Sequence, residues 1–230
     1  MNRFTILLSL AFILDNANAQ SLDDHVSQSS FVRAYDISGK PFTDKRLENV
    51  EGSPMFSPDW NLGNVTFKNG TTVKDIPLQF NLYDNQVYFR KDTVLLAFVQ
   101  PVTSFEFAFT DNGVKRLGHF SNGYPFVQNN NEWTYYQILA AGPLQLLKYS
   151  YATLVEKPAY AQSSHFEFQM WHELYAYDSN NKTIVKIKDR SSLANAFPEF
   201  ADRINEYAAQ HHSKLKSEED LTALFNTLNQ

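Results

Sequence analysis

The chain has 230 residues, of which 43% are hydrophobic and 20% are charged, and its formal net charge is -5 at pH 7. This length suits one ordinary domain, and the composition is too apolar for an intrinsically disordered protein. The mild acidity argues against a nucleic-acid-binding protein, which normally carries a basic patch. Cysteine is absent, which excludes a disulfide framework, a cysteine-ligated metal centre and thiol catalysis.

The first residues have the pattern of a secretory signal peptide. Arg3 precedes an apolar run over residues 4–14, and the small-x-small triplet Ala-Asn-Ala follows at 17–19. A transmembrane helix needs about 20 apolar residues, so this run is too short to span a bilayer. The pattern predicts a signal peptide over 1–19 that is cleaved before Gln20, a periplasmic or cell-surface location, and no transmembrane segment in the mature chain.

After a polar lead-in over residues 20–50, in which only 31–35 resembles a strand, the sequence takes on a period of two. Val65 and Phe67 alternate with polar residues and lead into the hairpin-turn signal Asn69-Gly70. The same alternation predicts strands over 65–68, 78–83, 87–89, 105–109, 114–120, 133–139, 144–154, 165–177 and 183–188. We therefore predict an antiparallel β domain over 51–188, built as a meander of hairpins. The pattern leaves open whether the sheet is barrel-like or curved and open.

The last part of the chain, residues 189–230, changes to a helical period. Pro198 suits a first helical turn. Apolar residues then follow at helix spacing: Phe200, Ile204, Tyr207 and Ala208. Ser217 resembles a helix cap before a second apolar face: Leu221, Leu224, Phe225 and Leu228. These faces predict two helices that pack on the β domain, so the expected fold class is mainly β (α+β) with C-terminal α-helices.

Motifs for catalysis and metal binding are incomplete. The pair His172-Glu173 begins like a zinc-protease motif, but the second histidine that the motif requires is absent. His211 and His212 end a predicted helix, where a cation is favourable, and residues 178–181 lack the spaced carboxylates of a calcium loop and are interpreted as a turn. We therefore assign no catalytic residue, no metal ligand and no cofactor.

The aromatic residues of the 165–177 strand are the best candidates for binding. By alternation, Trp171, Tyr175 and Tyr177 lie on the face opposite Phe166 and Phe168. If the phenylalanine face is core, the other face is partly exposed, covered by the helices or used for binding. Strands are enriched in aromatic residues for structural reasons alone, which is the alternative. We predict that Trp171, Tyr175 and Tyr177 contribute to a binding surface and not to a reaction centre.

Short blocks of the sequence resemble a known family. They are Gly52-Ser53-Pro54, Gly63-Asn64-Val65, the run V-K-D-I-P-L at 73–78 followed by Phe80-Asn81, and a lysine-rich turn at 214–216 before a leucine-rich last helix. Together they resemble a widespread family of uncharacterised secreted proteins of Gram-negative bacteria over residues 52–230. Gln79 departs from the pattern, where the family has a basic residue. The resemblance implies an envelope protein and brings no catalytic residue.

These observations favour an exported, non-enzymatic envelope protein that binds an apolar ligand, a glycan or an envelope partner. The first alternative is a hydrolase or other enzyme whose site is assembled from scattered strand residues. The second is a structural interaction protein. An enzyme would show convergent polar groups in a pocket, whereas a binding protein would show an apolar or aromatic surface.

Overall fold

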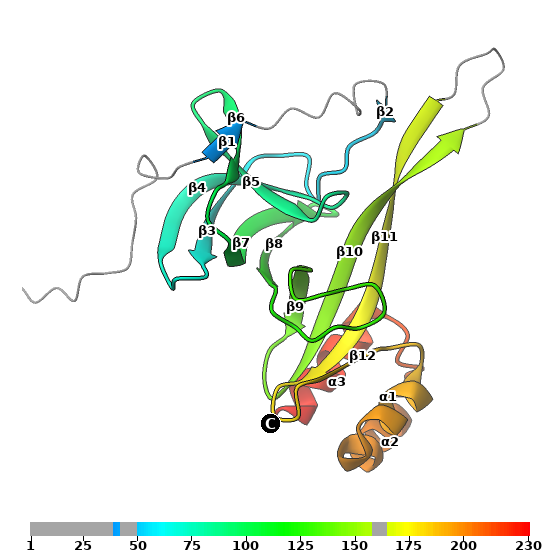
Figure 1. Cartoon of the computed structure of the whole chain (residues 1–230). Helices are drawn as coiled ribbons and strands as arrows, with labels where there is room; N and C mark the ends of the chain where they lie inside the picture. Colours follow the sequence, from blue (N-terminus) through cyan, green and yellow to red (C-terminus); the bar gives the residue numbers. More distant parts are fainter. Residues whose placement is uncertain (1–38, 42–49, 158–164) are drawn as a thin grey trace, which may run out of the picture.

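The computed structural model describes residues 39–41, 50–157 and 165–230. Strands make up 51% of the described residues and helices 18%, and the helices follow the sheet (Figure 1). This confirms the predicted fold class. The predicted signal peptide and the strand-like segment at 31–35 lie outside the described residues. Within the described part of the chain, no helix is both long and apolar enough to span a membrane.

The strands belong to one large sheet. In chain order they are β1 (Gly39–Pro41), β2 (Val50–Glu51), β3 (Asn61–Phe67), β4 (Thr72–Asn81), β5 (Gln86–Lys91), β6 (Val94–Phe98), β7 (Val102–Asp111), β8 (Val114–Ser121), β9 (Tyr136–Ala140), β10 (Leu144–Lys157), β11 (His165–Asp178) and β12 (Thr183–Lys186). Their order in the sheet is β1-β6-β5-β4-β3-β7-β8-β9-β10-β11-β12, and β2 pairs with β11. Because β1 and β12 are separate edges, the sheet is not closed into a barrel.

Several neighbouring strands are joined by tight turns, and the predicted turn at Asn69-Gly70 connects β3 to β4. Asn112 and Gly113 both have a positive φ, 48° and 81°, and connect Asp111 to Val114. A two-residue turn of this kind matches the twist of an antiparallel pair. The sheet departs from the predicted antiparallel meander in two ways. β3 pairs with β7 and β1 with β6, which are not consecutive in the chain, and β2 pairs with β11 in parallel. Both β1 and Val50 lie in the segment predicted as a polar lead-in, so part of that segment pairs with the sheet.

A phenylalanine core fills the concave side of the first part of the sheet. Phe105 and Phe120 stack with ring centroids 4.7 Å apart, and Phe80 meets Phe105 edge to face at 5.1 Å. These rings come from β4, β7 and β8. Ala152 of β10 and Phe168 of β11 pack against the same core. The long hairpin is therefore held to the first part of the sheet by its apolar side chains.

The β10–β11 hairpin is the longest element, with 14 residues in each strand. Its pairing runs without a break from Leu144↔Asp178 to Lys157↔His165. Its inner half, residues 144–148 and 174–178, lies between β9 and β12 in the sheet. Its outer half, residues 149–157 and 165–173, extends past these neighbours (Figure 1). We use the names inner half and outer half below.

The C-terminal helices cover one face of the inner half. They are α1 (Arg190–Ala196), the 3-10 turn η3 (Pro198–Phe200), α2 (Ala201–Gln210) and α3 (Glu218–Leu228). Leu224 and Phe225 of α3 are fully buried in a cluster that includes Leu144 and Ala176 of the hairpin. Ser217 caps α3 as predicted, because its side chain accepts a hydrogen bond from the backbone N–H of Asp220. The short helix α1 was not predicted from the sequence.

The end of α3 is also tied to the sheet by hydrogen bonds. The Asn229 side chain accepts from the backbone N–H of Leu144 at 3.1 Å and donates to the Leu144 carbonyl at 2.8 Å. Arg203 of α2 donates to the carbonyls of Thr227 at 2.7 Å and Leu228 at 3.0 Å, which are among the last carbonyls of α3. Helix carbonyls at this position have no partner within their own helix. The two helices and the β9–β10 turn therefore form one connected unit.

Candidate functional site

The predicted binding residues Tyr175 and Tyr177 lie in a tyrosine cluster inside the protein. Tyr175 is fully buried and Tyr177 is partly buried. The ring of Tyr136 is 5.4 Å from that of Tyr175, and the ring of Tyr124 is 5.0 Å from that of Tyr177. The β8–β9 connection, residues 122–135, brings Tyr124 over this face. Tyr175 and Tyr177 lie on the predicted face of β11, and the β8–β9 connection covers both side chains.

Glu173 joins polar groups of the cluster, whereas the buried Tyr136 hydroxyl has no hydrogen-bond partner among the described residues. The Tyr175 hydroxyl lies 2.7 Å from Oε2 of Glu173, and Nζ of Lys186 lies 2.6 Å from Oε1 of the same carboxylate. Burial raises the pKa of Tyr175, and its hydrogen bond to Glu173 raises it further. Burial opposes ionisation of Glu173, but the bonds from Lys186 and Tyr175 outweigh it and lower the pKa of this carboxyl. The arrangement is a protonated phenol and an ionised carboxylate that hold the strands together.

Trp171 has a different environment, on the outer half of the hairpin. It is 45% exposed and pairs across the strands with Tyr151. Its indole Nε1–H donates to the Thr153 hydroxyl at 3.1 Å, which orients the ring. The rings of Tyr149 and Tyr151 stack beside it, 5.1 Å apart and within 18° of parallel. Tyr149, Tyr151 and Trp171 thus form an aromatic strip along one face of the outer half.

Tyr149 and Tyr151 were not predicted from the sequence as members of this surface. Both lie on one face of the predicted 144–154 strand, so alternation could have grouped them with each other. Alternation within one strand does not predict the register between β10 and β11. The strip depends on that register, because it forms only when Tyr151 stands opposite Trp171. Of the three predicted binding residues, the structure places Trp171 at the surface beside Tyr149 and Tyr151, and Tyr175 and Tyr177 in the tyrosine cluster.

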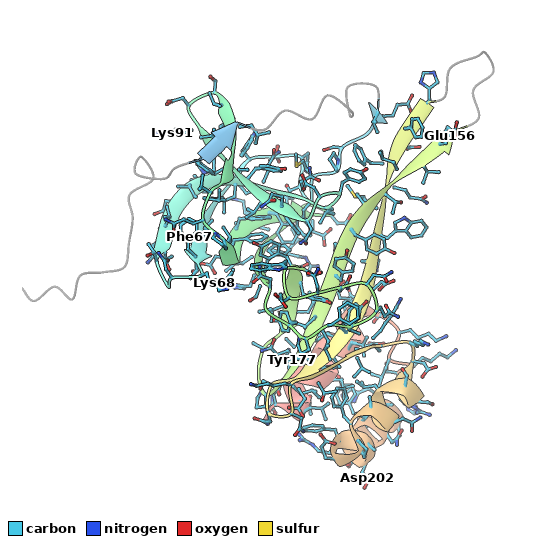
Figure 2. All side chains as sticks on the ribbon, viewed as in Figure 1. Phe67, Lys68, Lys91, Glu156, Tyr177 and Asp202 are labelled. Atoms are coloured by element: carbon cyan, nitrogen blue, oxygen red, sulfur yellow. The ribbon has the colours of Figure 1, made fainter. Side chains whose placement is uncertain are left out.

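The other face of the outer half also exposes large apolar side chains. Phe166 is 39% exposed and Met170 43% exposed, while Phe168 between them is buried and meets the ring of Tyr83 at 5.5 Å. On the strip face, Val155 is 40% exposed. Figure 2 shows how far these strands, with Glu156 near their end, extend from the body of the protein. Exposed apolar side chains grouped in this way are typical of interaction surfaces.

A second group of polar side chains lies on the open face of β3, β7 and β8. Nδ1 of His119 is 2.7 Å from Oε2 of Glu106, and the Asn64 amide donates to Oε1 of Glu106 at 2.7 Å. A cavity of 490 Å³ opens beside them. An enzyme of the predicted alternative kind that used covalent catalysis would need a nucleophile bonded to such a base. Among the described residues, the nearby Ser121 hydroxyl bonds to backbone carbonyls instead.

The other candidate residues from the sequence lie in a turn and at the end of a helix. Asp178 is buried, and its carboxylate accepts from the backbone N–H of Asn180 at 2.8 Å and from the Asn181 amide at 2.6 Å, so this segment is a turn as interpreted. His211 ends α2 and stacks on Tyr207 at 4.0 Å. Across residues 39–41, 50–157 and 165–230, no three or more His, Asp or Glu side chains are placed to hold a metal ion.

Comparisons with known proteins found no relative of this chain. No protein-family model, no curated protein and no solved structure matches the chain. The functional argument therefore rests on the fold and on the surfaces described above.

Proposed function

We propose that the protein is an exported, non-enzymatic envelope protein that docks a partner protein on the outer half of the β10–β11 hairpin. The observation that carries this proposal is the aromatic strip, in which Trp171 is 45% exposed and oriented by its hydrogen bond to Thr153. Exposed, rigid aromatic side chains dominate the binding energy of many interfaces. The export and the envelope location rest on the signal-peptide pattern and on the family resemblance.

A protein partner explains this surface better than a glycan or a small apolar ligand. A sugar ring stacks on one flat face, but the outer half exposes large apolar side chains on both faces, with Trp171 on one and Met170 on the other. A partner that covers both faces of a hairpin must itself be large. Aromatic residues and methionine are also the residues enriched at protein interfaces.

The proposal can be tested by site-specific photo-crosslinking in cells that produce the protein. A photoreactive amino acid at position 171 is expected to give one discrete adduct. The same amino acid at position 133 is the matched control, because Trp133 is 48% exposed but lies on the β8–β9 connection under Lys68. With the purified adduct partner, Trp171→Ala should weaken binding by about tenfold or more, and Trp133→Ala should not.

Two results would contradict the proposal. One is an equal yield of adducts from positions 171 and 133, which would mean that the contact is not specific to the hairpin. The other is binding to purified cell-wall sacculi that Trp171→Ala abolishes while no protein adduct forms, which would favour the glycan alternative.

A further inference from the structure

β8 has an open edge along most of its length. All of its residues, Val114–Ser121, pair with β7 on one side. On the other side, β9 pairs with Phe120 and Ser121 alone among the described residues. The sheet therefore divides after these two pairs, and in the described part of the chain residues 114–119 of β8 have a neighbouring strand on one side only.

The backbone groups that point from this edge can be identified. Asp111 and Val114 flank a two-residue turn, and the backbone N–H of Asn122 donates to the Thr103 carbonyl at 3.0 Å. In an antiparallel pair, hydrogen-bonded positions alternate, so residues 114, 116, 118 and 120 bond to β7. Lys115, Leu117 and His119 consequently direct their N–H and C=O groups away from β7, toward the gap.

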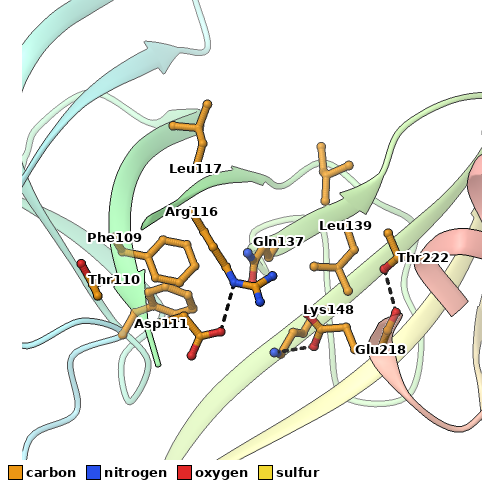
Figure 3. A pocket seen from close by; sticks show the side chains of 12 residues that line it. Phe109, Thr110, Asp111, Arg116, Leu117, Gln137, Leu139, Lys148, Glu218 and Thr222 are labelled. Atoms are coloured by element: carbon orange, nitrogen blue, oxygen red, sulfur yellow. Dashed lines mark hydrogen bonds and ion pairs between the residues drawn. The ribbon is translucent and has the colours of Figure 1, made fainter. Parts of the chain in front are cut away.

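A cleft occupies this gap. A cavity of 570 Å³ is lined by Arg116 and Leu117 of β8, by Ile138 and Leu139 of β9, and by Glu218 at the start of α3 (Figure 3). The 490 Å³ cavity lies on the open face of β3, β7 and β8 and shares only Ile138 with this one. We call the 570 Å³ cavity the β8–β9 cleft.

The charges of the cleft are paired within its walls. Nε of Arg116 lies 3.3 Å from Oδ2 of Asp111, and Nζ of Lys148 lies 2.6 Å from Oε2 of Glu218 (Figure 3). Within each pair the two opposite charges neutralise each other. The cleft therefore has no excess charge that would select a strongly charged ligand. The uncharged side chains that remain are mixed, with Leu117, Ile138 and Leu139 apolar and Thr110, Gln137 and Thr222 polar. Beside them runs a row of backbone donors and acceptors at strand spacing. An extended polypeptide offers the matching row of donors and acceptors.

We propose that the β8–β9 cleft accepts an extended segment of a partner polypeptide, which pairs with β8 at Lys115, Leu117 and His119 as an added strand. Main-chain hydrogen bonds supply affinity in this mode of recognition, and side-chain pockets supply selectivity. Leu117, which is 56% exposed at the middle of the edge, provides an apolar contact for the incoming strand. This site is separate from the outer half of the hairpin and goes beyond the docking function proposed above.

The probe for this proposal is a displayed library of random peptides of about 10 residues, long enough to cover an average strand. The library is selected on the whole mature protein, and an enriched peptide is synthesised. Leu117→Pro removes an N–H that points into the cleft and leaves the bonds to β7 intact, so an edge position tolerates it. It should weaken peptide binding by about tenfold, while Leu117→Ala, which keeps the N–H, should have a smaller effect.

A second measurement uses the unmodified protein and does not depend on the folding of the proline variant. Hydrogen exchange of Lys115, Leu117 and His119 should slow on peptide binding, while residues 114, 116 and 118 are already protected by β7. Methylation of the peptide backbone at alternate nitrogens should weaken binding with a period of two. A library that yields no binder, or a bound peptide that leaves Lys115, Leu117 and His119 unprotected, would overturn the proposal. Trp171→Ala should leave peptide binding unchanged, which separates this test from that of the hairpin.

Discussion

The inner and outer halves of the β10–β11 hairpin follow the same alternation but differ in what covers them. In the inner half, the helices cover one face and the β8–β9 connection covers the other. In the outer half, both faces carry exposed apolar side chains. Tyr175 and Trp171 show the difference: they lie on the same face of β11, four residues apart, and their exposed fractions are 0% and 45%.

This comparison shows that alternation determines which way a side chain points but not whether it is buried. Burial of Tyr175 depends on Tyr124 and on residues 122–135, which are distant from it in the sequence. Trp171 lacks such a cover in the described part of the protein. The same residue type can therefore serve as core in one half of a strand and as a docking surface in the other.

The largest expected effect comes from removing the cover of the inner half. Deletion of residues 217–230 removes α3 and exposes the apolar face around Leu144 and Leu146. Leu221, Leu224, Phe225 and Leu228 are buried, and each buried side chain of this kind contributes about 1.5–3 kcal/mol. We expect insoluble protein or a loss of cooperative unfolding, measured by solubility and thermal melting.

The control for this deletion is Asn226→Ala, which changes an exposed residue of α3 and should melt like the parent protein. A deletion variant with an unchanged melting temperature would show that α3 does not stabilise the inner half.

Paired alanine substitutions test the two halves directly. Tyr175→Ala removes a fully buried ring and should lower the free energy of unfolding by about 3–5 kcal/mol. Trp171→Ala removes a half-exposed ring and should lower it by less than about 1 kcal/mol. Urea unfolding measures both values. A loss at Trp171 as large as that at Tyr175 would mean that the outer half is core, and the docking proposal would then fail.

The buried and partly buried tyrosines on and around the hairpin should make the protein sensitive to high pH. Burial raises the pKa of five tyrosines: Tyr124, Tyr135, Tyr136, Tyr149 and Tyr175. The pKa of Tyr136 is raised to about 12. A phenol with a raised pKa in the folded state stabilises the fold fully below its ordinary value of 10.0. That contribution falls as the pH rises from this value through the folded pKa. We expect unfolding and tyrosine ionisation to coincide in an alkaline absorbance titration.

The matched variant for this titration is Tyr136→Phe, which removes one of these phenols and keeps the ring. It should reduce the loss of stability above the ordinary pKa by about 1.4 kcal/mol per pH unit. Ionisation of all tyrosines before unfolding would contradict the assignment of these rings to the core.

The smallest expected effect concerns Glu173, at the boundary between the two halves. Its pKa is lowered on folding, because the bonds from Lys186 and Tyr175 outweigh the effect of burial. The ionised carboxylate therefore stabilises the fold above the unfolded value of 4.5, and this contribution is lost as the pH falls through the lower folded value. Glu173→Gln should cost about 1 kcal/mol at neutral pH. The difference from the parent protein should vanish in acid, as measured by urea unfolding at both conditions.

Much of the fold could be predicted from local patterns. The turn at Asn69-Gly70, where Gly70 has a φ of 83°, was predicted from its hairpin-turn signal, and α3 from the spacing of Leu221, Leu224 and Leu228. Short elements escaped prediction. α1 has seven residues and a single buried side chain, Leu193, so it carries almost no periodic signal.

The candidate site was predicted only in part, because a surface that joins two strands depends on their register. Alternation placed Trp171 correctly on the face opposite Phe168. It could not show that Tyr151 stands beside Trp171, nor that β9 leaves β8 after Phe120 and Ser121. Register and strand separation follow from contacts between residues far apart in the chain, which no single segment encodes.

The sequence by itself determined the class of fold, the direction of each side chain along its strand and the amphipathic faces of the last helices, because these depend on neighbours two to four residues away. The tertiary structure alone decided which faces are covered. The β8–β9 connection buries Tyr175, the helices bury Leu144, and nothing described covers Trp171 or the edge of β8 at Leu117. Burial depends on where distant segments pack, so the two proposed binding surfaces emerge only when the whole chain is folded.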